Sequence, residues 1–172
     1  MNNPKVLWFT GLSGAGKSTL ARALSEALIK SGHKVSILDG DALRQSISKD
    51  LGFSDEDRAE QMRRVIALAK SQLDDGAFVI TALISPLKKM RDLARDTIGQ
   101  DRFIEVYVNT PLSVCEERDP KGLYRKARLG IIQQMTGIDS AYEPPINPEI
   151  IIDTSTNTIN QYLLNILKVI NN

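Results

Sequence analysis

Residues 6–19 read Val-Leu-Trp-Phe-Thr-Gly-Leu-Ser-Gly-Ala-Gly-Lys-Ser-Thr, and this stretch decides the fold. Its second part fits the phosphate-loop pattern, which is a glycine, four residues, and then Gly-Lys-Ser or Gly-Lys-Thr. The apolar run before the pattern is typical of a buried strand, and apolar residues recur after it with helical spacing as far as Gly32. Strand, loop and helix therefore follow one another as a phosphate loop requires. An ordinary glycine-rich turn, the alternative, does not explain Lys17 and Ser18 at the start of the helix.

The residue types of this loop predict a binding site for the phosphates of ATP. Glycines let successive backbone N–H groups approach phosphate oxygens at the positive end of the following helix. The Lys17 ammonium is expected to reach the β- and γ-phosphates, and the Ser18 hydroxyl to ligate Mg²⁺. We expect the phosphoryl donor to contact Gly11, Ser13, Gly14, Ala15, Gly16, Lys17, Ser18 and Thr19.

The composition excludes several other classes of protein. With 172 residues the chain is expected to form a single domain, and 22 Lys and Arg against 21 Asp and Glu leave a formal net charge of only +1. This balance argues against a nucleic-acid or membrane partner and favours a small anion. No signal-peptide pattern and no apolar run of the ~20 residues that span a bilayer is present, so a cytoplasmic location is expected. Cys115, the only cysteine, excludes an intramolecular disulfide and is expected to pack in the core.

The order of apolar and amphipathic segments predicts an α/β fold of the P-loop NTPase type, with a parallel sheet flanked by helices. Apolar runs of the buried-strand type occur at Val6–Thr10, Val35–Leu38, Phe78–Thr81, Phe103–Val108 and Ile150–Ile152. Helical spacing occurs at Lys17–Lys30, Asp41–Ser48, Ser54–Asp74, Leu87–Ile98, Leu112–Arg118 and Ile159–Ile170. The apolar positions of the third helix suit either the core or an interface.

Residues 119–148 differ from the rest of the chain. They are rich in glycine, proline and basic residues and contain no clear strand. A segment of this length inside a compact domain is either disordered or a functional lid. Its position after a strand and a helix favours the lid, so we call residues 119–148 the lid segment.

Two carboxylates follow the second predicted strand. Because ligands of open α/β sheets collect at the carboxyl ends of the strands, Asp39 and Asp41 are expected beside the phosphate loop. A carboxylate there can hold a metal or accept the proton of an attacking hydroxyl. The alternative role is a helix cap, which one of the two is expected to fill as well.

Arginines come next along the chain. Arg44 and Arg58 flank Phe53, an aromatic residue in a loop whose ring could stack on a base, and guanidinium groups bind phosphate and sulfate in a forked geometry. For Arg63 and Arg64, the residue pattern fits a solvated helix face as well as it fits anion binding.

These segments together resemble the adenylyl-sulfate kinase (APS kinase) family, which phosphorylates the 3′-hydroxyl of adenosine 5′-phosphosulfate (APS) with ATP. The resemblance covers nearly the whole chain. Its narrowest parts are Arg118-Asp119-Pro120-Lys121-Gly122-Leu123-Tyr124 and Thr136-Gly137-Ile138-Asp139, both inside or beside the lid segment. The phosphate loop, Leu38–Asp41 with Arg44, Leu51–Ser54 and Ile84–Pro86 also match.

The resemblance implies a Mg²⁺-assisted kinase of sulfate assimilation that forms a homodimer. It implies Asp41 as the candidate base, Lys17 as a catalytic residue, Asp39 with Ser18 at the metal, and Arg118 at the donor. It places the acceptor against Asp41, Arg44, Phe53, Arg58, Gln61, Ile84, Ser85, Lys121 and Met135. It also suggests a phosphoenzyme role for Ser85, but an in-line transfer needs no covalent relay, and we expect this hydroxyl to cap the next helix instead.

The departures from the family pattern lie on the acceptor side. Ala42 stands where asparagine is usual, Gln61 also replaces an asparagine, and Met135 replaces a phenylalanine. A kinase of the same fold acting on another nucleotide-linked hydroxyl is therefore the alternative prediction. A nucleotide-binding switch that acts through a partner is a second one, which the paired carboxylates and the long lid segment disfavour.

Overall fold

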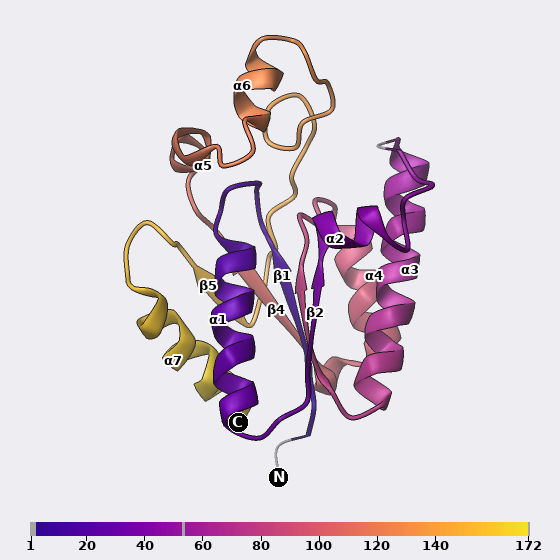
Figure 1. Cartoon of the computed structure of the whole chain (residues 1–172), viewed down its shortest axis with the longest axis vertical. Helices are drawn as coiled ribbons and strands as arrows, with labels where there is room; N and C mark the ends of the chain where they lie inside the picture. The colour runs from indigo at the N-terminus through magenta and orange to yellow at the C-terminus, as the bar shows by residue number, and fades with distance from the viewer. Residues whose placement is uncertain (1–2, 53, 172) are drawn as a thin grey trace.

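A computed structural model describes residues 3–52 and 54–171, and its centre is a sheet of parallel strands in the order β2-β3-β1-β4-β5 (Figure 1). The strands are β1 (Val6–Thr10), β2 (Val35–Asp39), β3 (Phe78–Ala82), β4 (Phe103–Val108) and β5 (Ile150–Ile152). The helices are α1 (Lys17–Lys30), α2 (Gly40–Gln45), α3 (Asp55–Asp74), α4 (Lys88–Ile98), α5 (Leu112–Arg118), α6 (Leu123–Arg128) and α7 (Ile159–Asn171), with a 3₁₀ turn at Gln100–Arg102. The predicted parallel α/β fold is confirmed.

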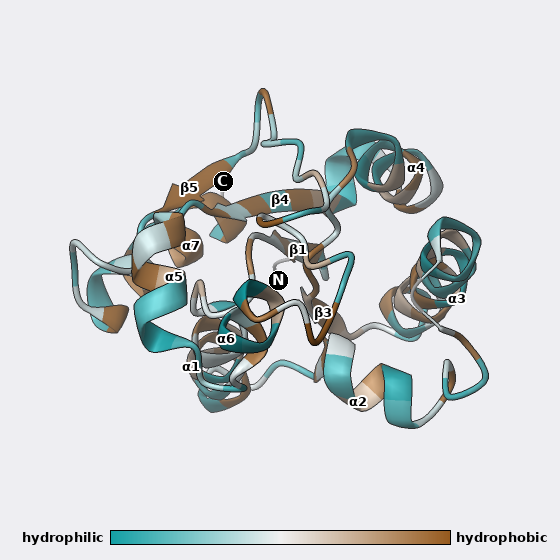
Figure 2. Ribbon diagram, turned by 90° about the horizontal axis from the view of Figure 1, so that it is seen from above, coloured by the Kyte–Doolittle hydropathy of each residue, from teal (hydrophilic) through white to brown (hydrophobic). Residues whose placement is uncertain are grey.

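The sheet is buried on both faces, which explains its continuous apolar runs. β1 lies between β3 and β4, with Val6 opposite Val79 on one side and Phe103 on the other, and all its residues are buried. Helices α1 and α7 cover one face, and α3 and α4 cover the other (Figure 2). A strand covered on both faces needs apolar side chains at every position rather than at alternate ones.

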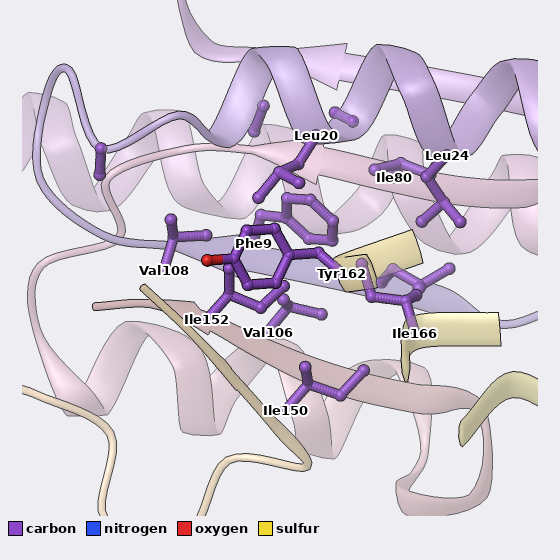
Figure 3. Close-up of a cluster of buried hydrophobic side chains, with 14 of the residues drawn as sticks. Phe9, Leu20, Leu24, Ile80, Val106, Val108, Ile150, Ile152, Tyr162 and Ile166 are labelled. Atoms are coloured by element: carbon purple, nitrogen blue, oxygen red, sulfur yellow. The ribbon is translucent and has the colours of Figure 1, made fainter. Parts of the chain in front are cut away.

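Successive residues of β1 supply two separate cores, because side chains alternate across a strand. Leu7 and Phe9 pack with Leu20 and Leu24 of α1 and with Ile166 of α7 (Figure 3). On the other face Trp8 packs with residues of α3 and α4. The apolar residues of α3 therefore fill the core, and those buried there are Met62, Val65, Ile66, Ala69 and Leu73. Cys115 is buried in the first cluster, as expected.

Most predicted helices begin and end within one residue of the observed ones, and α2 is the main exception. The predicted span Asp41–Ser48 ends early because the N–H groups of Ser46 and Ser48 both bond the Leu43 carbonyl and close a turn. Asp39 caps α2 by accepting the N–H of Asp41 at 3.0 Å, which confirms that one of the two carboxylates is a cap.

The lid segment lies above the carboxyl ends of the strands and contains α6, which the sequence did not predict (Figure 1). The Asp119 carboxylate accepts the N–H groups of Tyr124 and Arg125, so it satisfies donors at the start of this short helix. Six residues are too few to show helical spacing in a sequence. Among residues 3–52 and 54–171, no helix is long and apolar enough to cross a membrane.

Gly11 is the residue at which β1 passes into the phosphate loop, and it leaves no room for a side chain. Its φ is +149°, and a Cβ there would lie 2.5 Å from the carbonyl oxygen of Val108. Gly76 also has a positive φ, +82°, but a Cβ there would meet nothing within 4 Å.

We expect Gly11→Ala to destabilise the protein more than the matched change Gly76→Ala. Gly76→Ala should lower the free energy of unfolding by roughly 1–2 kcal/mol, the cost of a left-handed alanine. Gly11→Ala should lower it by about 1–3 kcal/mol more, because the new methyl group pushes on β4. Urea unfolding measures both values, and equal losses would show that the approach to Val108 does not limit this position.

Candidate active site

The phosphate loop joins β1 to α1, and its backbone packs closely against α5 and the segment after β5. A Cβ at Gly14 would lie 3.0 Å from the carbonyl oxygen of Cys115, and one at Gly16 would lie 3.0 Å from Thr154 Cγ2. Both glycines have a positive φ, at +75° and +104°. Glycine is therefore required at these positions by space as well as by conformation.

Side chains bind the carbonyl oxygens of this loop one after another. Lys17 Nζ donates to the carbonyls of Gly11 and Leu12 at 2.8 and 2.6 Å. The Tyr124 hydroxyl donates to the carbonyl of Ser13 at 2.8 Å. Arg118 donates to the carbonyl of Gly14 at 3.3 Å, so this predicted donor-site residue does lie at the loop.

Two threonines complete the series. The carbonyl of Ala15 accepts hydrogen bonds from the hydroxyls of Thr110 and Thr154 at 3.0 and 2.8 Å. Thr154 also accepts a hydrogen bond from Arg118 at 2.7 Å. The sequence interpretation gave neither threonine a role, although each stands two residues after a strand, where ligands of such sheets collect.

This arrangement turns the loop into an anion site. In a planar trans peptide the N–H points away from the carbonyl of the preceding residue. Holding the carbonyls of Ser13 and Ala15 from outside therefore directs the N–H groups of Gly14 and Gly16 inward. The first N–H groups of α1 add to them because they have no carbonyl one turn earlier to bond. Thr19 lies exposed in this first turn.

Lys17 is a buried cation at the centre of the loop. Its side chain is 8% exposed, and burial lowers the pKa of its ammonium to about 8. The nearby Lys121 lowers this pKa further, whereas the carboxylates of Asp39 and Asp41 oppose the shift.

Ser18 and Asp39 form an oxygen pair beside Lys17. The Ser18 hydroxyl donates to Asp39 Oδ2 at 2.6 Å, so the two predicted metal ligands are together. A hydroxyl and a carboxylate are hard oxygen donors that fit Mg²⁺, which keeps several waters and takes substrate phosphates as further ligands. Among residues 3–52 and 54–171, no group of three or more His, Cys, Asp or Glu could hold a metal without such help.

Asp41 stands in the first turn of α2, two residues after Asp39, and is exposed. Its carboxylate forms an ion pair with Lys121 of the lid segment, so two predicted acceptor-side residues that are distant in sequence are in contact.

The other acceptor-side residues lie on α2, α3 and the lid segment. Arg44 donates to the carbonyl of Gly52 at 2.8 Å, and burial lowers the pKa of its guanidinium. Arg58 donates to the carbonyl of Gln134 at 2.9 Å, so α3 and the lid segment are joined here. Gln61 is half-buried one turn after Arg58, and Phe53 lies outside the described residues.

Met135 is packed into the protein. It is 7% exposed and belongs to the apolar cluster that also contains Phe9 and Tyr124. The Asp139 carboxylate accepts the N–H groups of Gln134 and Met135 and fixes this turn of the lid segment. The methionine thus lies between the lid segment and the core of the sheet.

The expectation that Ser85 caps the next helix was wrong. The N-cap of α4 is Leu87, and no side chain bonds that helix end. The Ser85 hydroxyl instead accepts the indole N–H of Trp8 at 3.1 Å, and Ser85 is 2% exposed. The neighbouring Ile84 offers its carbonyl to the Thr10 hydroxyl at 2.7 Å.

Comparisons with known proteins agree on one family. A family model described as adenylylsulphate kinase matches residues 3–153. The chain is 58% identical over 147 residues to an adenylyl-sulfate kinase of Aeromonas hydrophila, covering 86% of this chain and 75% of that protein. It is 52% identical over 167 residues to an adenylyl-sulfate kinase of Vibrio cholerae, covering 97% and 78%.

A solved structure has the same fold throughout. The Mycobacterium tuberculosis APS kinase CysC, in complex with AMPPNP and APS, superposes with a TM-score of 0.94 at 42% identity and covers 100% of both chains. The similarity therefore includes the lid segment and the phosphate loop alike.

The lowered pKa of Lys17 predicts that ATP affinity depends on pH. Below pH 8 the ammonium of the free protein is charged and attracts phosphate, and above pH 8 it loses its proton. The dissociation constant of ATP should therefore rise by up to about tenfold per pH unit above 8, until the pKa in the complex is reached. Calorimetric titrations from pH 7 to 9.5 measure this rise. Lys17→Met should bind ATP weakly with no such rise, and an unchanged rise in that variant would assign it to another group.

Proposed function

The chain belongs to the adenylylsulphate kinase family, and we propose that it transfers the γ-phosphoryl group of ATP to the 3′-hydroxyl of APS. The products are ADP and 3′-phosphoadenosine 5′-phosphosulfate, an activated sulfate used in sulfate assimilation. The observation that carries this proposal is the meeting of a phosphate loop with Asp41 and Lys121 at one edge of the sheet. The protein is thus a phosphotransferase with an alcohol group as acceptor.

On the donor side, the loop binds and orients the triphosphate of ATP. Its inward N–H groups contact phosphate oxygens, and the Lys17 ammonium stabilises the charge that develops on the transferred group. Ser18 and Asp39 would hold Mg²⁺, which supplies positive charge beside the phosphates. Arg118 is close enough to the loop, through Gly14 and Thr154, to contact the nucleotide as well.

On the acceptor side, Asp41 accepts the proton of the 3′-hydroxyl as its oxygen attacks the γ-phosphorus. The new O–P bond forms as the bond to the β-phosphate oxygen breaks, and ADP leaves with that electron pair. The forked guanidinium groups of Arg44 and Arg58 suit the phosphate and sulfate of APS. Lys121, now paired with Asp41, can exchange that carboxylate for an anionic group of the acceptor.

We propose direct transfer without a phosphoserine. The Ser85 hydroxyl is buried against the Trp8 indole, and no carboxylate or imidazole within residues 3–52 and 54–171 bonds it. A serine nucleophile needs an adjacent base to remove its proton. Ser85 is better suited to contact the acceptor than to carry the phosphoryl group.

A coupled assay of ADP release tests the function. ADP should form quickly with ATP and APS together, and slowly with ATP alone or with adenosine 5′-monophosphate as acceptor. Faster turnover of another nucleotide would favour the alternative acceptor that the changes at Ala42, Gln61 and Met135 raise. Failure to bind APS at all, measured by calorimetry, would favour a nucleotide-dependent switch.

Asp41→Asn should lower kcat by about 10²–10⁴-fold with little change in ATP affinity. The amide keeps the shape of the side chain but cannot accept the hydroxyl proton. Asp92→Asn is the matched control, because Asp92 of α4 is an exposed carboxylate that also pairs with a lysine, Lys88, but has no part in the proposed mechanism. Rapid-quench measurement of the chemical step separates the two variants. If Asp41→Asn were silent and Asp39→Asn abolished turnover, the two carboxylates would have the opposite roles.

We also propose that the chain is a single kinase domain in which residues 119–148 order further over the bound nucleotides. Support comes from Lys121, which contacts Asp41, and from Arg58, which holds the turn at Gln134. An ATP analogue with APS should slow amide hydrogen exchange in this segment more than either ligand alone. Equal exchange in the free and doubly liganded protein would mean that the segment is static.

A homodimer and a cytoplasmic location complete the proposal. The dimer rests on the family resemblance alone, because the apolar residues of α3 are used inside the subunit. Sedimentation equilibrium measures the mass, and a monomer would refute this part. The cytoplasm supplies the ATP that the reaction consumes, and fractionation of cells would test the location.

A further inference from the structure

The turn at Ser85 is strained, and both its hydroxyl and its carbonyl oxygen accept hydrogen bonds. Ser85 has a φ of +43°, which is uncommon outside glycine. Its hydroxyl accepts from Trp8, and its carbonyl accepts from Arg91 at 2.7 Å and from the Thr10 hydroxyl at 3.3 Å. Such a conformation persists only where its surroundings hold it. The question is which group holds this turn in place.

Arg91 of α4 is a buried cation that the proposed mechanism does not use. It is 3% exposed, and its Nε pairs with Glu105 Oε1 at 2.8 Å. One terminal nitrogen binds the carbonyl of Ser85, and the other donates to the carbonyl of Glu143 at 2.7 Å. The planar guanidinium therefore bridges three partners in three directions, which the ammonium of a lysine cannot reproduce.

Glu143 belongs to the part of the lid segment that leads back to β5 (Figure 1). Its N–H donates to the carbonyl of Pro86 at 2.8 Å, and its carboxylate accepts the N–H of Lys88 at 2.5 Å. Two further bonds thus join this returning chain to the turn at Ser85. Arg91 lies between the two segments. Among these contacts, only those of Arg91 are made by a buried charged side chain.

We propose that Arg91 is a positioning residue for the acceptor, because it fixes the Ser85 turn relative to the base of the lid segment. This inference rests on the proposed function, in which Ser85 and the lid segment contact APS. The phosphate loop is held mainly by Tyr124, Arg118 and the two threonines. It meets the Ser85 turn only at its start, where the Gly11 N–H lies 3.4 Å from the Ile84 carbonyl. Disturbing Arg91 should therefore affect the acceptor more than ATP.

Arg95 offers a matched control on the same helix. It also pairs with Glu105, at 3.4 Å, and it binds the Glu149 carboxylate at 2.6 Å. It contacts neither the Ser85 turn nor Glu143. A comparison of Arg91→Lys with Arg95→Lys therefore separates the positioning of the turn from the general effect of weakening this charge network.

Steady-state kinetics with ATP and APS make the comparison. Arg91→Lys should raise the KM for APS about tenfold or more and lower kcat, with the KM for ATP within about twofold of wild type. Arg95→Lys should leave both KM values within about twofold. If Arg91→Lys does not fold, Glu143→Ala replaces it in the comparison, because Glu143 is exposed and the change removes its side-chain bond to the Lys88 N–H. It should raise the KM for APS in the same direction by a smaller factor.

Amide hydrogen exchange provides a readout that needs no acceptor. Arg91→Lys should speed exchange at both the Ser85 turn and Glu143, whereas Arg95→Lys should not. The inference is overturned if Arg91→Lys changes the two KM values equally, or if Arg95→Lys reproduces its kinetic and exchange effects. Wild-type protein that does not phosphorylate APS would reject the proposed function instead, and the exchange data would still decide whether Arg91 holds the turn.

Discussion

The phosphate loop depends on one constraint, which is that each of five consecutive carbonyl oxygens, from Gly11 to Ala15, has a hydrogen-bond donor. An unpaired carbonyl dipole at this place would repel phosphate. Lys17 supplies two of the bonds, and side chains of α5, α6 and the segments after β4 and β5 supply the others. The loop is local in sequence, but its shape is set by four distant parts of the chain. The order of the sheet, with β4 beside β1 and β5 beside β4, brings those parts together.

The sequence predicted the elements whose pattern is set locally. Strands buried on both faces require continuous apolar runs. The phosphate loop requires glycines where its backbone approaches Val108 of β4, Cys115 of α5 and Thr154 after β5. Contacts between residues far apart in the sequence could not be predicted. Nothing near Ser85 in the sequence reveals that Trp8, 77 positions away, binds its hydroxyl. Thr110 and Thr154 were also missed, because two threonines become a pair only when the sheet has formed.

The donor and acceptor sides of the site are built differently. Most residues proposed for the donor stand on one continuous loop and helix whose conformation is held by hydrogen bonds, and only Asp39 and Arg118 come from other elements. Residues proposed for the acceptor are distributed over α2, α3 and the lid segment, and contacts such as that of Arg58 with Gln134 join these elements. Under the proposed function, the departures from the family pattern at Ala42, Gln61 and Met135 fall on the acceptor side.

Two tyrosines attach the lid segment to the chain near both of its ends. Near its start, Tyr124 bonds the carbonyl of Ser13, and near its end the Tyr142 hydroxyl lies 2.9 Å from that of Thr10. The lid segment is thus attached near both ends to the same four residues of the chain, Thr10–Ser13. A segment attached in this way cannot open about a single hinge. Because its ends are already joined, settling over a ligand sacrifices less chain entropy than capture by a free loop would.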